Sequence, residues 1–127
     1  MSIAYNKAKG SKWESDLVNH LREKFPAYSD SIHRTRLAGA NDQGDVLATL
    51  PFNGQKRHII IEAKNVAKFD LSTFIGEVTD EVENWVHAVN PTSPVTGVVV
   101  IKRKNRSVGQ AYVVQTLDSF LEMVKDA

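Results

Sequence analysis

Three residues in the middle of the chain, Asp45, Glu62 and Lys64, have the types and spacing of a hydrolytic metal site. Between the two acids lies Asn53-Gly54, the strongest short-range signal for a two-residue β-hairpin turn. If these two residues form the turn, paired positions have numbers that sum to 107, and Asp45 lies directly opposite Glu62. A wider turn is an alternative because Pro51 cannot donate to a ladder, and it would shift the register and make the opposition diagonal. The Cβ atoms of the two acids are then about 5 Å apart.

Two carboxylates at this separation require a positive charge between them. They repel each other by roughly 3 kcal/mol at an effective dielectric near 20, and directly opposed like charges destabilise a sheet. A divalent cation removes this repulsion, and oxygen ligands without sulfur favour Mg²⁺, with Mn²⁺ as a substitute. Because Lys64 follows Glu62 by two residues, a strand projects both side chains from the same face. Such a site can activate a water molecule and stabilise charge on a phosphate.

The alternative is that Glu62 and Lys64 form an ordinary surface ion pair and that Asp45 ends a loop. Glu-x-Lys is frequent by chance, so the motif alone does not decide. The position of the motif favours a functional site over a surface ion pair. Glu62 directly follows the three isoleucines at 59–61, which are expected for a strand buried on both faces. A polar pair that interrupts such a strand needs a reason that a solvated face does not.

The remaining pattern predicts an α/β domain. A helix is expected over 7–24, a short strand within 28–37, and the hairpin strands over 45–50 and 58–63. Residues 71–89 form a helix with one apolar face, from which Glu77, Asp80, Glu81 and Glu83 are predicted to point away. A strand over 95–101, a basic turn over 102–106, a strand over 110–116 and a short helix from Leu117 follow. The core order αβββαββα predicts a central mixed β-sheet flanked by helices.

Length and composition are those of one globular domain spanning residues 1–127. The absence of cysteine excludes disulfides and thiolate metal sites. No apolar run approaches the roughly 20 residues that cross a bilayer, and the first residues lack the apolar stretch of a secretory signal. We therefore expect a cytoplasmic protein with no membrane association.

The net charge is only +1, but the charges are unevenly distributed. Residues 7–36 carry seven bases against four acids, residues 102–106 carry four bases, and residues 70–83 carry five acids and no base. Such polarity allows one face to meet a polyanion, although solvated surfaces would give the same pattern. The candidate phosphate contacts are Lys9, Lys12, Arg34, Arg36, Lys102, Lys104 and Arg106.

Two groups of motifs resemble a known nuclease superfamily. Gly44-Asp45-Val46 followed by Ile60-Ile61-Glu62-Ala63-Lys64 resembles the PD-(D/E)xK nucleases. Lys9-Gly10 before a helical segment with an early Glu14, together with Arg34-x-Arg36, is similar to the archaeal-type Holliday junction resolvases of that superfamily. The resemblance covers the first half of the chain by motif and the rest by element order. One departure is Gly44, which stands where the superfamily usually has proline.

The resemblance implies a restriction-endonuclease-like fold and a role for each matching residue. Asp45 and Glu62 would bind the metal with the carbonyl of Ala63, Lys64 would act as base or electrostatic partner, and Glu14 would complete the site. For Glu14 a second interpretation is open, since Ser11-x-x-Glu14 is also the signature of a capping box at a helix start.

The function that the resemblance implies is Mg²⁺-dependent cleavage of four-way (Holliday) DNA junctions in a bacterial or phage-infected cell. Such an enzyme must cut two strands related by a two-fold axis, so we expect a homodimer. The same chemistry on linear duplex, flap or nicked DNA is an alternative, because a fold does not fix a substrate. A non-catalytic nucleic-acid-binding module is a further alternative, and opposed buried acids argue against it.

Overall fold

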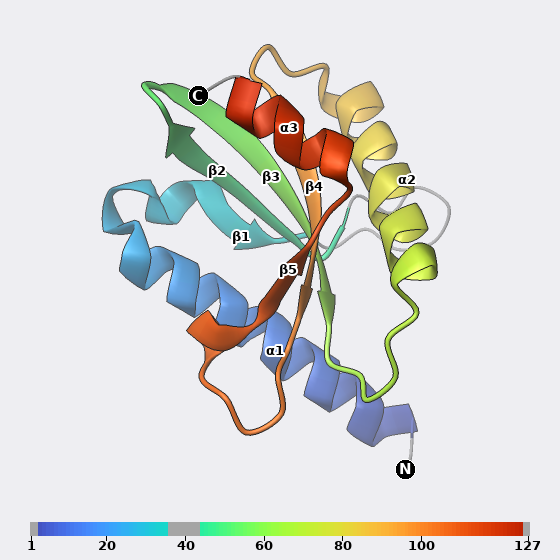
Figure 1. Cartoon of the computed structure of the whole chain (residues 1–127). Coiled ribbons are helices and arrows are strands. Elements are labelled where there is room, and N and C mark those ends of the chain that lie inside the picture. The colour runs from blue at the N-terminus through green and yellow to red at the C-terminus, as the bar shows by residue number, and fades with distance from the viewer. Residues whose placement is uncertain (1–2, 36–43, 126–127) are drawn as a thin grey trace.

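The computed structural model describes residues 3–35 and 44–125 (Figure 1). Its α-helices are α1 (Ile3–Lys24), α2 (Leu71–Val89) and α3 (Leu117–Lys125), and its strands are β1 (Ile32–Arg34), β2 (Val46–Phe52), β3 (Gln55–Lys64), β4 (Val95–Ile101) and β5 (Tyr112–Val114). Two 3₁₀ helices, η1 (Pro26–Ser31) and η3 (Val108–Gln110), lie between them. The protein is thus an α/β domain with helices around a five-stranded sheet, as the sequence pattern predicts.

The sheet is mixed and has the order β1-β2-β3-β4-β5. β3 is central, antiparallel to β2 and parallel to β4. The hairpin between β2 and β3 has the predicted two-residue turn, in which Asn53 (φ 50°) and Gly54 (φ 82°) adopt the left-handed conformation that this turn requires. The register from Phe52↔Gln55 to Val46↔Ile61 is the predicted one.

The long helices cover opposite faces of this sheet (Figure 1). Trp13 and Leu17 of α1 pack on one face, against a buried cluster that includes Ile61 and Val100. Phe74 and Val78 of α2 pack on the other face. Each helix therefore buries the central part of its predicted apolar stripe, whereas Leu71, Val86 and Val89 near the ends of α2 are 38–50% exposed. α2 approaches β4 closely at Gly97, where an added Cβ would lie 2.7 Å from Val82 Cγ2.

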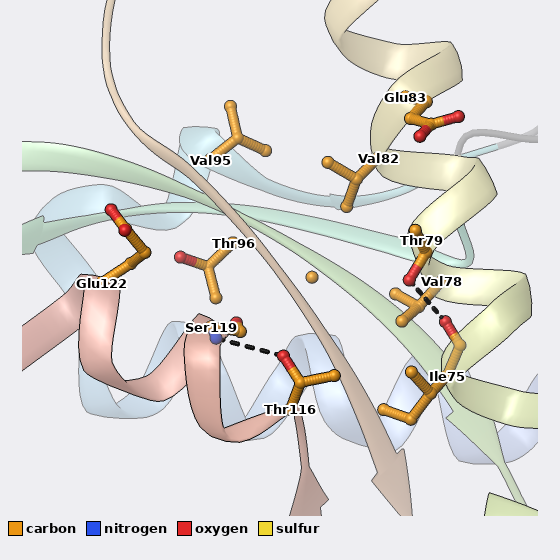
Figure 2. A pocket seen from close by; sticks show the side chains of 11 residues that line it. Ile75, Val78, Thr79, Val82, Glu83, Val95, Thr96, Thr116, Ser119 and Glu122 are labelled. Atoms are coloured by element: carbon orange, nitrogen blue, oxygen red, sulfur yellow. Dashed lines mark hydrogen bonds between the residues drawn. The ribbon is translucent and has the colours of Figure 1, made fainter. Parts of the chain in front are cut away.

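The third helix, α3, turns polar residues towards α2 and β4 and leaves its apolar residues exposed. Thr116, at its start, and Ser119 and Glu122 line a hollow of about 340 Å³ between α3, α2 and β4 (Figure 2). The apolar residues of α3 lie on the side of the helix that faces away from this hollow, and they are 48–70% exposed. These residues are Leu117, Phe120, Leu121 and Val124. We call these four residues the α3 stripe; it faces solvent in the single chain.

The elements differ from the prediction mainly at their ends. α1 begins at Ile3 rather than at residue 7, and β5 has three residues instead of the predicted seven over 110–116. Residues 26–31 form a 3₁₀ turn, so only 32–34 of the predicted strand remain. None of the helices that the structure describes is long and apolar enough to cross a membrane.

Candidate active site

Three carboxylates from two elements meet at the carboxyl end of β3. Glu62 of β3 lies beside Glu77 and Glu81 of α2, with one oxygen of each within 4.8 Å of the others. Glu62 and Glu81 are only 6% and 4% exposed. Buried acids are rare unless they are paired or bind a cation, so this cluster is the strongest candidate for a metal site in the part of the chain that the structure describes.

The surroundings of Glu62 disfavour a negatively charged carboxylate unless a cation or a proton is bound to it. Its Oε2 atom is buried and receives no hydrogen bond from an N–H or O–H donor of the described residues. Burial, followed by the neighbouring carboxyl groups of Glu81 and Asp45, raises the pKa of Glu62 to about 11. In the absence of a cation the site therefore holds a proton. A divalent ion can replace that proton and use the same oxygens.

Asp45 belongs to this site, but not in the geometry that the hairpin arithmetic predicts. The ladder ends at Val46↔Ile61, and the N–H of Asp45 donates to the carbonyl of Ile61 rather than to that of Glu62 (2.9 Å). Its Oδ2 accepts a hydrogen bond from the N–H of Ala63 (2.8 Å). Direct opposition to Glu62 is therefore wrong: Asp45 reaches across the end of the ladder, and its carboxyl group still influences the pKa of Glu62.

The backbone conformation at position 44 requires a glycine before Asp45. The φ of Gly44 is +97°, and an added Cβ would lie 2.7 Å from Ile60 Cγ2 and 3.3 Å from Glu81 Oε2. Proline, which is fixed near φ −65°, cannot adopt this conformation. The departure from the superfamily motif thus accompanies a backbone bend that places Asp45 against β3.

Lys64 is the cation of the site. Its Nζ lies 3.0 Å from Glu77 Oε2 and 3.7 Å from Glu62 Oε1, and 4.8 Å from the centre of the Phe74 ring. Burial lowers the pKa of Lys64, but the hydrogen bond to Glu77 and the nearby carboxylates outweigh burial and raise it overall. Lys64 therefore carries a proton at neutral pH, which favours an electrostatic role over that of a general base.

Glu14 lies outside the carboxylate cluster. Its Oε1 accepts a hydrogen bond from Arg34 Nη2 (3.2 Å), and it is not among the residues whose oxygens meet at Glu62. The capping-box interpretation is wrong, because α1 is already helical at Ile3 and Ser11 lies well inside it. The metal role of Glu14 stays a prediction, with Arg34 as its observed partner.

The prediction that the acids of α2 point away from its apolar face is wrong for two of them. Glu81 is buried with Phe74, Val78 and Trp85, and Glu77 one turn earlier bonds to Lys64. The sequence carried a signal for Glu81, since it lies three residues after Val78 and four before Trp85, within the buried stripe. An acid in such a stripe indicates a polar partner on the sheet.

Four of the predicted phosphate contacts lie together. Lys9 of α1 and Lys102, Lys104 and Arg106 line one groove of about 840 Å³. Lys12 instead pairs with Asp16 on its own helix (2.9 Å). Arg34 pairs with Glu14, and Arg36 lies outside the described residues.

Comparison of the chain with protein-family models, with curated proteins and with solved structures finds no match. The features of the chain that bear on its function are therefore the carboxylate cluster, Lys64 and the basic groove.

Proposed function

We propose that this protein is a divalent-metal-dependent DNA endonuclease that cleaves branched DNA, in particular four-way junctions. The observation that supports it most strongly is the convergence of the Glu62, Glu77 and Glu81 carboxylates beside Asp45 and Lys64. The restriction-endonuclease-like fold is part of the proposal, and the element order and the mixed sheet agree with it.

The residues present fit Mg²⁺ or Mn²⁺, because the ligand set consists of oxygens alone. Glu62 and Asp45 would hold the ion, with a carboxylate of α2 and the Ala63 carbonyl as further candidate ligands. When bound, the ion supplies an activated water and charge stabilisation at the phosphate. Lys64, held protonated by Glu77, can donate a hydrogen bond to a phosphate oxygen and offset its developing negative charge.

The basic groove supports DNA as the substrate. It lies next to the site, because Asn65 follows Lys64 directly and the N–H of Lys102 donates to the Lys64 carbonyl (2.9 Å). Phosphates bound along the groove would thus be held beside the carboxylates. The same features would serve a nuclease for linear duplex, flap or nicked DNA. A binding module without activity is less well supported, because DNA binding gives no reason to bury Glu62 and Glu81 together.

The choice between substrates can be made directly. With Mg²⁺, we expect a four-way junction to be cut at least about tenfold faster than a linear duplex of the same sequence, a difference of about 1.4 kcal/mol in transition-state stabilisation. Cleavage of end-labelled strands followed on denaturing gels measures both rates. Equal rates would refute the junction proposal but not the nuclease proposal, and no cleavage of any branched or linear DNA with Mg²⁺ or Mn²⁺ would refute both.

The α3 stripe supports a homodimer. Its half-exposed apolar side chains offer roughly 400 Å² per protomer, as large as the largest patch on an ordinary monomer. Paired about a two-fold axis, two such stripes would bury roughly 800 Å² of apolar surface, and polar residues around them would have to supply the rest of the roughly 1,200 Å² of a specific interface. A second copy is the occupant that the symmetry of a four-way junction demands.

Leu121→Lys tests this interface. We expect the variant to sediment as a 14.1 kDa monomer and the wild type at twice that mass. In a two-fold dimer the two introduced ammonium groups would be buried close together and would repel each other. The matched control is Val89→Lys, which places the same charge on a 50% exposed apolar residue of α2. A wild-type monomer at micromolar concentration, free and on junction DNA, would refute the dimer.

A further inference from the structure

The groove beside Lys64 has a composition that phosphate binding alone does not explain. Its twelve lining residues include five cations and no acid. They also include three aromatic residues, Tyr5, Phe69 and Tyr112, which are 45–55% exposed. A duplex needs only the cations, because its bases are stacked on each other and present edges rather than faces.

Two of the aromatic residues form a defined platform with an arginine. The rings of Phe69 and Tyr112 meet edge to face, with centroids 6.1 Å apart and an interplanar angle of 79°. The guanidinium carbon of Arg103 lies 4.9 Å from the centroid of Tyr112. Aromatic rings and stacked arginines are the groups on which proteins stack unpaired bases.

The platform is held by three separate segments at one end of the sheet. Phe69 lies in the loop after β3, Arg103 in the turn after β4, and Tyr112 at the start of β5 opposite Ile101. Lys102, Lys104 and Arg106 of the same turn add charge around it. A strand that runs along this groove would place its phosphates on the turn and its bases on the rings, at a short distance from Lys64.

We propose that this groove binds an unpaired segment of DNA, with at least one base stacked on Tyr112 or on Phe69 and its phosphates on the basic turn. The inference deepens the proposed nuclease function and rests on it for the identity of the substrate. It assigns the groove to the strand that leaves the stack at a branch, rather than to a paired arm. The aromatic rings would then help the protein distinguish distorted from regular DNA.

The experiment measures DNA binding without cleavage. Fluorescence anisotropy in EDTA compares a short single-stranded oligonucleotide with a duplex of the same sequence. Tyr112→Ala should weaken binding of the single strand roughly tenfold or more, the loss expected for one stacked base, and change duplex binding less than about twofold. Tyr112→Phe, which keeps the ring, should retain wild-type binding, whereas Arg106→Ala should weaken both probes and reduce their salt dependence.

Controls separate stacking from unfolding. Tyr28→Ala removes an exposed tyrosine of η1 outside the groove and should change neither probe. Phe69→Ala is a second test at a loop residue where truncation leaves the sheet intact, and it should also weaken the single strand selectively. In addition, a photoreactive 5-iodouracil in the oligonucleotide should cross-link to Tyr112 or Phe69, located by peptide mass spectrometry.

The inference would be overturned if Tyr112→Ala and Phe69→Ala weakened single-strand and duplex binding equally, or if neither variant weakened single-strand binding. Its failure is distinct from that of the proposed function, because no metal or cleavage is involved. If the protein binds single strands selectively but cleaves no DNA, only the nuclease proposal is refuted. If the protein cleaves junctions but Tyr112→Ala binds single strands as the wild type does, only the assignment of the groove is refuted.

Discussion

Glu62→Gln is expected to reduce metal-dependent DNA cleavage by about 10³-fold or more while leaving DNA affinity within about twofold of wild type. Glutamine keeps the size of the side chain but cannot give up a proton to become the negatively charged ligand that a metal ion would need, 3.7 Å from Lys64. Asp45→Asn should have the same effect, because Asp45 contributes the second carboxylate at the end of the ladder. Single-turnover cleavage of labelled junction DNA, together with binding in EDTA, measures both quantities.

The matched control is Glu83→Gln, which removes an acid of α2 outside the carboxylate cluster. It should cleave at the wild-type rate. Unchanged cleavage in Glu62→Gln would remove the basis of the assignment, whereas joint loss of cleavage and DNA binding would point to a change in fold.

The same Glu62 variant has a second readout, its stability without metal. The pKa of Glu62 in the folded protein, about 11, is above its ordinary value of 4.5, so its contribution to stability is fully present below 4.5 and is lost as pH rises towards 11. Glutamine has no proton to lose. In EDTA, Glu62→Gln should therefore unfold at higher urea than wild type at about pH 8, by on the order of 1–3 kcal/mol, and near equality is expected below about pH 5.

The parts of the structure that the sequence predicts well are those fixed by local rules. Asn53-Gly54 determines the hairpin turn, and the turn in turn sets the register of β2 against β3 over seven pairs. The helix over 71–89 matches α2 at both ends, where Asp70 caps the first turn and Asn90 adopts the left-handed conformation. In both cases short-range chemistry and the tertiary fold favour the same conformation.

The prediction fails where no local pattern marks the structure. Ser11 and Glu14 have the spacing of a helix cap, yet the helix extends past them because the preceding residues are also helical. The direct opposition of Asp45 and Glu62 extrapolates a regular ladder beyond the point where Gly44 bends the backbone. The first outcome concerns residues that are mostly exposed, so no apolar stripe marks where α1 begins. The second depends on how closely the backbone packs at Gly44, which the hairpin pattern does not encode.

The carboxylate cluster combines residues that lie close together in the sequence with residues that do not. Asp45, Glu62 and Lys64 are recognisable because they lie near one another in the sequence pattern of a hairpin. Glu77 and Glu81 belong to a helix on the far side of the connection, and only the packing of α2 against the sheet brings them to Glu62. Similarly, the basic groove joins the first helix, two loops and the start of β5, which no contiguous motif encodes.

Glu81→Gln is the variant that decides whether α2 supplies a metal ligand. We expect it to weaken Mn²⁺ binding, measured by isothermal titration calorimetry, by at least about 10- to 100-fold, because the site would lose one of its two most buried carboxylates. The comparison is Glu83→Gln on the same helix, which should bind Mn²⁺ as the wild type does. Glu77→Gln should have a smaller effect on affinity and a larger one on cleavage, since Glu77 holds the ammonium of Lys64.

Two variants, Glu81→Gln and Asp45→Asn, distinguish two possible positions of the metal ion. If Glu81→Gln binds Mn²⁺ normally while Asp45→Asn does not, the ion lies on the hairpin side with Asp45 and the Ala63 carbonyl, and the proximity of Glu81 only raises the pKa of Glu62. If both variants lose binding, the ion lies between the hairpin and α2. In that case the burial of Glu81 within the apolar stripe is explained by the cation it helps to hold, because a buried carboxylate is tolerated when it coordinates a metal.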